Sequence, residues 1–253
     1  MCLVQAASST DVAQNRRALA GFHAAEPADL MVFPEAFQRD FGRPGSDVSR
    51  DAEPLDGPFV SALVELAGAC RTTVVAGMFE TSPDPARPYN TLVVVDADGL
   101  RVRYRKIHLY DSFGYRESDR LSAGDVEPVV FEVAGLPVGL MTCYDVRFPE
   151  LARLVVDAGA QLLVLPAAWV AGPGKVDQWR TLVTARAIEN TCYVAAAAQP
   201  GPRYCGHSML VDPMGLVVQE ADETGGRMVV GTVDLAVVDE ARATNPSLAN
   251  RRL

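Results

Sequence analysis

Three residues far apart in the sequence, Glu35, Lys106 and Cys143, carry side chains that could do chemistry: a carboxylate, an ammonium and a thiol. A thiol attacks a carbonyl carbon as its thiolate, and because the ordinary pKa of cysteine is about 8.5, it needs a base beside it at neutral pH. A glutamate whose pKa is raised by partial desolvation can be that base. Each residue alone is a weak signal, since most cysteines outside disulfides are small buried hydrophobes and most glutamates lie on solvated surfaces.

Cys143 lies where a strand is expected to pass into a helix. The apolar run 138–141 predicts a strand that is buried on both faces. Pro149 suits the first turn of a helix, and Gly159 is placed to end that helix. A thiol at such a turn lies beside backbone N–H groups, which favour its thiolate and could receive an oxyanion.

The surroundings of Glu35 and Lys106 also favour burial. Glu35 lies in the apolar sequence Val-Phe-Pro-Glu-Ala-Phe, where a carboxylate would be partly desolvated. Strand alternation over 102–108 puts Lys106 on the side of Val102, Tyr104 and His108. His108 also permits a Cys–His pair, which we disfavour because it leaves Glu35 and Lys106 unexplained.

The elements that must position these residues occur twice. A strand at 2–7 and a helix at 11–25, capped by Thr10 or Asp11, open the first copy. Three kinds of segment then recur in the same order: an apolar strand broken by proline, a helix that runs into a strand, and a strand with an Asp-x-x-Gly turn. They lie at 28–37, 59–80 and 91–100, and again at 160–169, 178–199 and 207–216.

Each copy therefore reads strand–helix–strand–helix–strand–strand, which implies parallel crossovers with an antiparallel edge. Two such sheets, each covered by helices on one face, predict an α/β fold that is a duplicated four-layer α-β-β-α sandwich. We expect residues 1–253 to form a single domain. The copies differ where chemistry is concerned: Glu35 follows the proline in the first copy and Ala167 holds that place in the second.

Composition excludes several classes of protein. The formal net charge of −9 argues against a nucleic-acid surface and means that an anionic substrate would need a local cation. The sequence shows no signal peptide and no apolar run of membrane-spanning length, so no membrane partner is expected. Five scattered cysteines without Cys-x-x-Cys spacing, and only three histidines, favour a reduced cytoplasmic protein over a disulfide framework or a metal site.

Three motifs together resemble the signatures of the nitrilase superfamily of carbon–nitrogen hydrolases, in that family's order. They are Phe-Pro-Glu-Ala at 33–36, Lys-Ile-His-Leu-Tyr at 106–110 and Cys-Tyr-Asp-Val-Arg-Phe-Pro-Glu at 143–150. The resemblance covers nearly the whole chain, and that family's duplicated sandwich agrees with the internal repeat.

The resemblance implies a role for each residue. Cys143 would attack the amide carbon and Glu35 would take its proton. Lys106 and the backbone N–H of Tyr144 would stabilise the oxyanion, while Glu117 would position Lys106 and the substrate. Ammonia would leave, and water activated by Glu35 would hydrolyse the remaining thioester, with no metal or organic cofactor required.

For several residues near the motifs, the sequence allows two interpretations. Arg147 forms either a structural ion pair behind the nucleophile turn, which we favour, or a clamp on a substrate carboxylate. Tyr144, Trp169 and Trp179 either line the substrate pocket or belong to the core. Arg186 is expected on a solvated helix face.

The short chain length and the sequence of the nucleophile turn look most like those of the omega-amidase and deaminated-glutathione amidase branch. This branch implies hydrolysis of a small carboxylate-bearing amide to acid and ammonia. The alternatives are an N-carbamoyl amino acid hydrolase and a non-catalytic binding protein on the same fold, although the intact set of three residues argues against the latter. Irregular segments at 38–49 and 200–205 are expected beside the pocket and leave the acyl group undetermined.

The resemblance also implies an assembly. Family members pair through helices next to the nucleophile turn, which here are 149–158 and 178–190, so we expect a homodimer or a higher homo-oligomer.

Overall fold

The computed structural model describes residues 1–22 and 27–252. Within these residues two six-stranded sheets have the strand orders β14-β1-β2-β3-β4-β5 and β13-β12-β11-β10-β9-β8. The strands of the first sheet are β1 (Cys2–Gln5), β2 (Leu30–Val32), β3 (Thr73–Glu80), β4 (Tyr89–Asp96), β5 (Gly99–Arg105) and β14 (Arg227–Val230). Those of the second are β8 (Val130–Val133), β9 (Leu136–Leu140), β10 (Leu162–Ala167), β11 (Tyr193–Ala198), β12 (Met209–Val211) and β13 (Val217–Glu220).

The remaining elements connect or cover the sheets. The helices are α1 (Val12–Leu19), α2 (Pro58–Cys70), α3 (Pro149–Asp157), α4 (Lys175–Asn190) and α5 (Leu235–Thr244). Short 3-10 helices are η1 (Ser49–Asp51), η2 (Glu117–Asp119) and η3 (Cys143–Arg147), and the hairpin β6 (Asp111–Ser112) to β7 (Tyr115–Arg116) stands apart from both sheets.

The two halves repeat the same topology. Strands β1, β2 and β3 are parallel to one another, as are β9, β10 and β11, and in each half the next strand, β4 or β12, runs antiparallel. The crossovers contain α1 and α2 in the first half and α3 and α4 in the second. The expected strand–helix–strand–helix–strand–strand repeat is therefore confirmed.

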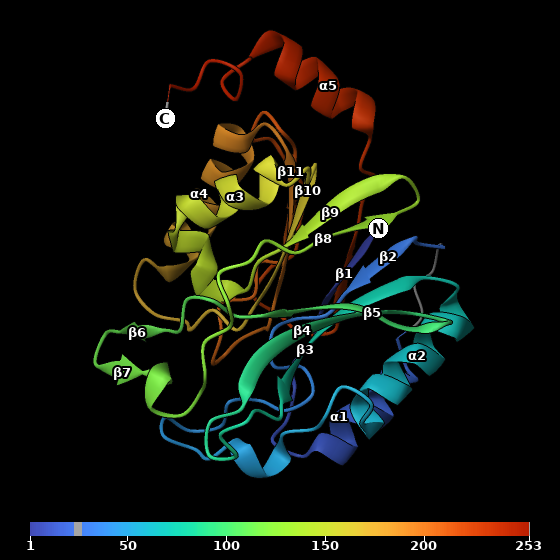
Figure 1. The fold of residues 1–253 in the computed structure, drawn as a ribbon, viewed down its shortest axis with the longest axis vertical. Helices are drawn as coiled ribbons and strands as arrows, with labels where there is room; N and C mark the ends of the chain where they lie inside the picture. Colours follow the sequence, from blue (N-terminus) through green and yellow to red (C-terminus); the bar gives the residue numbers. More distant parts are fainter. Residues whose placement is uncertain (23–26, 253) are drawn as a thin grey trace.

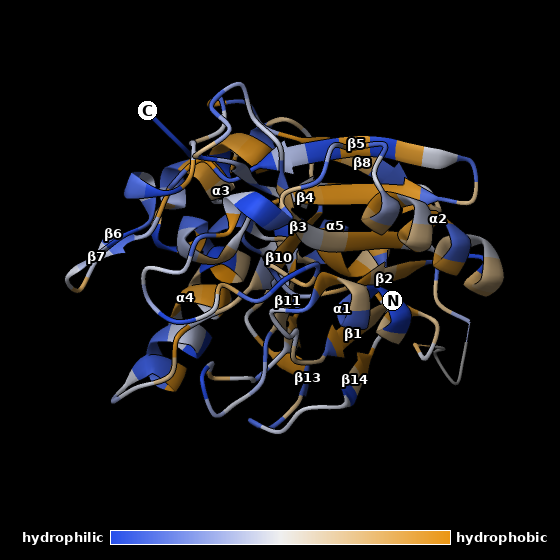
Figure 2. Cartoon of the chain, turned by 90° about the horizontal axis from the view of Figure 1, so that it is seen from below, coloured by the Kyte–Doolittle hydropathy of each residue, from blue (hydrophilic) through white to orange (hydrophobic). Residues whose placement is uncertain are grey.

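The layers follow from which strand faces are apolar. Side chains from both sheets, among them Leu3, Val75, Val138 and Val164, form one buried layer between the sheets. The opposite face of the first sheet packs on α1 and α2, and that of the second sheet on α3 and α4. Figure 1 shows the two helix pairs on opposite sides of the molecule, and in Figure 2 β3 and β4 are coloured as hydrophobic. The predicted four-layer α-β-β-α sandwich is confirmed.

Some predicted boundaries were wrong. The helix expected over 11–25 ends at Leu19, because Gly21 has a low helix propensity; residues 23–25 of that prediction lie outside the described residues. Its cap is Asp11, whose side chain accepts a hydrogen bond from Gln14 N. Strand β5 ends at Arg105, so His108 is positioned by the loop that follows and not by strand alternation.

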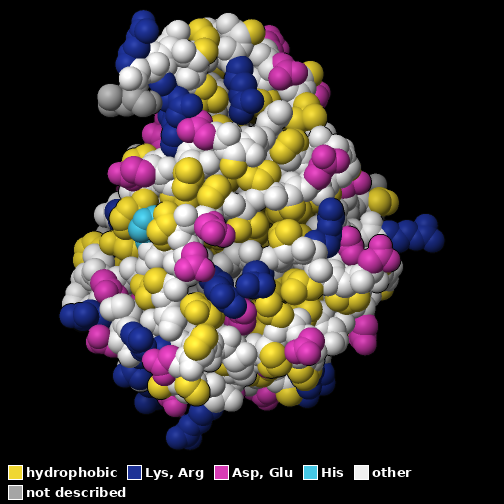
Figure 3. Space-filling model, in the orientation of Figure 1, with side chains coloured by type: hydrophobic (Ala, Val, Ile, Leu, Met, Phe, Trp, Pro, Cys, Tyr) yellow, Lys and Arg dark blue, Asp and Glu magenta, His cyan; other side chains and the backbone are white. Residues whose placement is uncertain are grey.

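Charges of both signs lie on the surface (Figure 3). In Figure 3 acidic and basic side chains are interspersed over the face shown. No helix in the described ranges is long and apolar enough to span a bilayer.

Candidate active site

The nucleophile turn begins directly after β9 and has an unusual backbone. Cys143, the first residue of η3, has φ +47°, in the left-handed region that L-residues rarely adopt. Such strain persists only where neighbours hold it. Asp145 accepts a hydrogen bond from Thr142 N at 2.9 Å, and Arg186 Nε donates to Val146 O at 2.8 Å, so both ends of the turn are fixed.

Asp145 links this turn to the first half of the chain. Its fully buried carboxylate accepts hydrogen bonds from Tyr104 Oη at 2.6 Å and from His108 N at 3.1 Å, and His108 Nδ1 lies 2.8 Å away. The imidazole of His108 also stacks on Phe148, with ring centroids 3.7 Å apart. His108 therefore positions the turn, in keeping with our rejection of a Cys–His pair. Sequence analysis gave Asp145 no role, although it lies within the cysteine motif.

Lys106 lies between two buried carboxylates. Its Nζ is 3.0 Å from Glu35 Oε1 and 3.0 Å from Glu117 Oε2, and all three residues are at most 2% exposed. Burial alone would lower the pKa of Lys106, but the charges of Glu117 and Glu35 outweigh it and raise that pKa well above its ordinary value. Lys106 is therefore a fixed cation. Burial raises the pKa of Glu117, and the charge of Lys106 offsets part of that effect.

Glu35 is held by donors from both halves of the chain. Its Oε1 accepts from Asn90 Nδ2 at 2.8 Å as well as from Lys106, and its Oε2 accepts from Ala168 N at 2.7 Å. Gln199 Nε2 donates to its backbone oxygen at 2.9 Å. Sequence analysis missed Asn90 and Gln199, because a single polar residue near a strand end carries no motif of its own.

A close backbone approach permits this position of Glu35. The turn after β2 lies against Gly77 of β3, where an added Cβ would come within 2.5 Å of Ala36 N. Only glycine leaves room for the turn to fold over the sheet in this way.

The thiol of Cys143 belongs to the same cluster. Burial raises the pKa of Cys143 well above its ordinary value, the charge of Glu35 and a hydrogen bond to it add to the effect, and the charge of Lys106 offsets part of it. Cys143 therefore carries a protonated, neutral thiol at neutral pH. Such a thiol needs its proton removed before it can attack, and Glu35 is the adjacent acceptor.

The structure thus brings together Glu35, Lys106, Glu117 and Cys143, which sequence analysis singled out from four segments. Tyr144 lies at the edge of this cluster, with its ring edge-on to Tyr110 at 5.0 Å between centroids. Trp169 is buried and its Nε1 donates to Lys175 O at 3.1 Å.

Two arginines behave differently from the favoured interpretations. In the part of the chain that the structure describes, Arg147 forms no ion pair; instead its Nη2 donates to Gln178 Oε1 at 2.7 Å and its Cζ lies 5.0 Å from the ring centroid of Trp169. Arg186 is 6% exposed and not solvated, because Val146 O and the carboxylate of Glu189 bind its guanidinium. Trp179 is a core residue, fully buried and bonded to His207 O.

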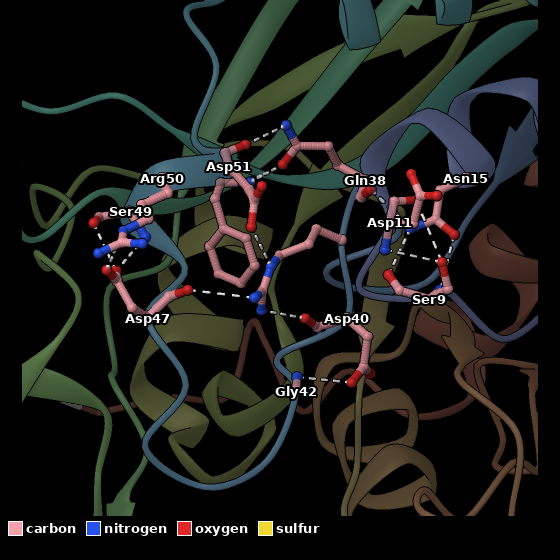
Figure 4. A network of polar contacts seen from close by, with 12 residues as sticks. Ser9, Asp11, Asn15, Gln38, Asp40, Gly42, Asp47, Ser49, Arg50 and Asp51 are labelled. Atoms are coloured by element: carbon pink, nitrogen blue, oxygen red, sulfur yellow. Dashed lines mark hydrogen bonds and ion pairs between the residues drawn. The ribbon is translucent and has the colours of Figure 1, made fainter.

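The irregular segment after Glu35 is tied to the segment after β11. Asp40 accepts hydrogen bonds from Gly42 N, from Arg203 Nη1 and from Tyr204 Oη, at 2.8, 2.8 and 2.7 Å. Figure 4 shows Asp40 and Gln38 within the polar network of this segment, which reaches Asp47 and Asp51. These two segments, expected beside the pocket, are thus joined across the halves.

Comparison with known proteins decides the family. The sequence matches the family model described as carbon–nitrogen hydrolase over residues 2–243. The chain belongs to the carbon–nitrogen hydrolase family. Deaminated glutathione amidase of Escherichia coli O157:H7 is 40% identical over 223 residues, which cover 88% of this chain and 84% of that protein.

Solved structures of carbon–nitrogen hydrolases have the same fold. A CN-hydrolase superfamily protein from Xanthomonas campestris, with an arsenic adduct in its active site, has a TM-score of 0.87 at 29% identity. The match covers 100% of this chain and 96% of the Xanthomonas chain. Nit3 of Saccharomyces cerevisiae, a member of branch 10 of the nitrilase superfamily, has a TM-score of 0.84 at 29% identity. The match covers 100% of this chain and 96% of the Nit3 chain. The predicted superfamily, the sandwich and the class of activity, cysteine-dependent hydrolysis of an amide, are confirmed.

Proposed function

We propose that this carbon–nitrogen hydrolase works through a thioester on Cys143, with Glu35 as the base and Lys106 as the oxyanion donor. The observation that carries the proposal is the single buried cluster in which Lys106 bridges Glu35 and Glu117 beside the Cys143 thiol. Because the catalytic groups come from both halves of the sandwich, residues 1–253 would act as one catalytic domain.

In the first half-reaction Glu35 takes the proton of the Cys143 thiol as the sulfur attacks the amide carbon. The carbonyl electron pair moves onto oxygen, where Lys106 Nζ and the backbone N–H of Tyr144 stabilise the negative charge. When that charge collapses, the C–N bond breaks and Glu35 returns the proton to the leaving nitrogen. Ammonia leaves from a primary amide, or an amine from a substituted one, and the acyl group stays on sulfur.

In the second half-reaction Glu35 takes a proton from water, and the oxygen of that water attacks the thioester carbon. The C–S bond breaks, the acid leaves and the proton returns to Cys143 sulfur. Glu117 touches Lys106 and Tyr110 N but not the thiol, so we assign it to holding the Lys106 ammonium in place. No step needs a metal or an organic cofactor.

The substrate we propose is a small carboxylate-bearing amide in a cytoplasmic setting. The relative named deaminated glutathione amidase supports an amide of this kind. No disulfide joins cysteines in the described ranges, as suits a reducing compartment.

Intact-protein mass spectrometry tests the thioester. After acid quench with a slowly hydrolysed amide, the wild-type mass should rise by the acyl group, mapped to the peptide that contains Cys143. Hydroxylamine should remove this adduct, because it takes the acyl group from sulfur as a hydroxamate and leaves the free thiol. The adduct should be absent in Cys143→Ala and present in Cys192→Ala, a buried cysteine of the same core cluster. Full amidase activity in Cys143→Ala would refute the mechanism. The substrates to compare are omega-amides, deaminated glutathione, N-carbamoyl amino acids and nitriles.

We also propose a homodimer that pairs through α3 and α4. Apolar side chains remain exposed on this side of the molecule, at Leu154 of α3, Ile188 of α4 and the turn between β12 and β13. Contact with a second copy would cover them and would support the Cys143 turn from behind.

A further inference from the structure

The turn that carries Glu35 has a strained backbone. Ala36, the next residue, has φ +55°, in the left-handed region that residues with a Cβ rarely adopt. Such a conformation persists only where neighbouring groups hold it. The position of the Glu35 carboxylate therefore depends on what holds the backbone of this turn.

Two polar side chains hold this backbone. Gln199 Nε2 donates a hydrogen bond to Glu35 O at 2.9 Å, and Ser8 Oγ donates one to Ala36 O at 2.9 Å. The two side chains also bind each other, since Gln199 Nε2 donates to Ser8 Oγ at 2.9 Å and Ser8 N donates to Gln199 Oε1 at 3.1 Å. Ser8 and Gln199 thus form one bracket on two successive carbonyl groups of the turn.

The amide of Gln199 is fully committed to this bracket. Gln199 is 1% exposed, both hydrogens of its amide are donated to Ser8 Oγ and Glu35 O, and its amide oxygen accepts from Ser8 N. An apolar side chain of the same size would leave these backbone groups without their partners, which is costly for buried groups. The glutamine at this position therefore serves the turn that carries Glu35.

The backbone of Gln199 ties the bracket to the second half of the sandwich. Its N–H donates to Ala167 O at 2.9 Å, and its oxygen accepts from Gly206 N at 3.0 Å. Ala168, the neighbour of Ala167, donates its N–H to Glu35 Oε2. The backbone and the carboxylate of Glu35 are consequently both held from the ends of β10 and β11, in the half of the chain that does not contain Glu35.

The register of the two sheets gives Ser8 a counterpart in the nucleophile turn. Leu3 of β1 and Leu140 of β9 take equivalent places beside the next strand of their sheets. Ser8 lies five residues after Leu3, as Asp145 does after Leu140. Asp145 fixes the nucleophile turn with donors from the first half, and Ser8 fixes the Glu35 turn with a donor from the second. Each half of the sandwich therefore holds the catalytic turn of the other.

We propose that Ser8 and Gln199 are positioning residues for the base, which fix the Glu35 turn so that its carboxylate meets first the Cys143 thiol and later the hydrolytic water. The inference rests on the proposed function, in which Glu35 is the base. Both residues act on the backbone of the turn and not on the reacting atoms. A shift of about 1 Å in a reacting group can cost about 100-fold in rate, so their loss should appear in kcat and leave KM near that of wild type.

A double-mutant cycle with Glu35 tests the role of Gln199. Gln199→Met keeps the size of the side chain and removes its three hydrogen bonds, so kcat should fall about 10- to 100-fold at an unchanged KM. In Glu35→Gln the same substitution should lower kcat by less than about twofold, because no base remains to be misplaced. Ser8→Ala should lower kcat in the same sense as Gln199→Met. Wild-type kcat in Gln199→Met, or an equal loss in both backgrounds, would overturn the proposal.

Gln5→Met is the matched control. Gln5 is a fully buried glutamine that also joins the two halves, since its Nε2 donates to Asp222 O at 2.7 Å and its Oε1 accepts from Ser208 N at 2.8 Å. Its loss should reduce stability to urea, as that of Gln199 does, while kcat stays that of wild type. A fall in kcat as large as in Gln199→Met would trace the effect to general loosening of the fold and would also overturn the proposal.

Alkylation of Cys143 separates failure of this inference from failure of the proposed function, because it needs no hydrolysis. The charge of Glu35 raises the pKa of Cys143, so a displaced Glu35 should let iodoacetamide react at lower pH in Gln199→Met than in wild type or in Gln5→Met. This shift, together with full amidase activity in Glu35→Gln, would reject the proposed function and keep the positioning role. An inactive Glu35→Gln, with neither the shift nor a loss of kcat in Gln199→Met, would reject the positioning role alone.

Discussion

The carboxylate of Glu35 accepts a hydrogen bond at 2.7 Å from the backbone N–H of Ala168. In the internal repeat, the turn Pro34-Glu35-Ala36 after β2 corresponds to Pro166-Ala167-Ala168, where β10 ends. The segment of the second half that has alanine in place of the glutamate thus binds the carboxylate of its counterpart. The two copies therefore face each other at the site, and each has kept a different part of the chemistry.

Replacement of Glu35 by glutamine should make the Cys143 thiol more acidic and at the same time reduce catalysis. The charge of Glu35 raises the pKa of Cys143, so its removal should lower that pKa while Lys106 keeps its charge. Alkylation of Cys143 by iodoacetamide should then rise at a lower pH than in wild type. Amide hydrolysis should fall about 10²- to 10⁴-fold, because the base is gone.

Peptide-resolved mass spectrometry of alkylation rates across pH checks this prediction. Glu65→Gln on the exposed face of α2 is the control and should change neither quantity. An alkylation profile that stays in place or moves to higher pH in Glu35→Gln would contradict the proposed arrangement of charges.

Asn90 should matter for rate more than for folding. Its amide holds Glu35 Oε1, so Asn90→Ala removes one hydrogen bond to a charged group. We expect kcat to fall about 10- to 100-fold, the kinetic equivalent of about 1.5–3 kcal/mol. Asn90→Asp should be worse, because it places a second carboxylate against Glu35. The control is Asn15→Ala. Asn15 is a buried asparagine whose Nδ2 donates to Ser9 O and Gln38 O, so this variant should be less stable to urea while its kcat stays that of wild type.

The fold could be predicted from the sequence because its signals are local and occur twice. Apolar strands, a proline at a helix start and Asp-x-x-Gly turns each act within a few residues, and the repeat fixed their order. Glu35, Lys106 and Cys143 lie within short motifs and could be found in the same way. Asn90, Asp145 and Gln199 could not, since their importance comes from contacts with residues 37 to 164 positions away. The same limit led to the wrong interpretations of Arg147 and Arg186.

Asp145 should be needed for the structure of the nucleophile turn. Its buried carboxylate receives hydrogen bonds from Tyr104, His108 and Thr142. Asparagine has the same shape but presents a donor where one oxygen accepted. Asp145→Asn should therefore lower the free energy of unfolding by at least about 1.5–3 kcal/mol and reduce kcat together with it.

Urea denaturation followed by tryptophan fluorescence measures the change in stability. Asp239→Asn, on an exposed position of α5, should stay within about 0.5 kcal/mol of wild type. A fully stable and fully active Asp145→Asn would show that the network does not hold the turn.

The exposed apolar side chains beside α4 should control assembly. Ile188 is 44% exposed and Leu216 is 66% exposed, and the turn that carries Leu216 lies against Ile188, because an added Cβ at the neighbouring Gly215 would come within 2.6 Å of the Ile188 side chain. Burial of such side chains at an interface is favourable, and an aspartate in their place would leave a charge without solvent. Sedimentation velocity should show a dimer for wild type and a monomer for the double variant Ile188→Asp, Leu216→Asp. Val126→Asp, at an equally apolar position that is 74% exposed, should remain dimeric.

Since α4 also carries Arg186, which binds Val146 O of the nucleophile turn, the monomer should lose activity. A wild-type monomer with full activity would reject both the interface and its support of Cys143.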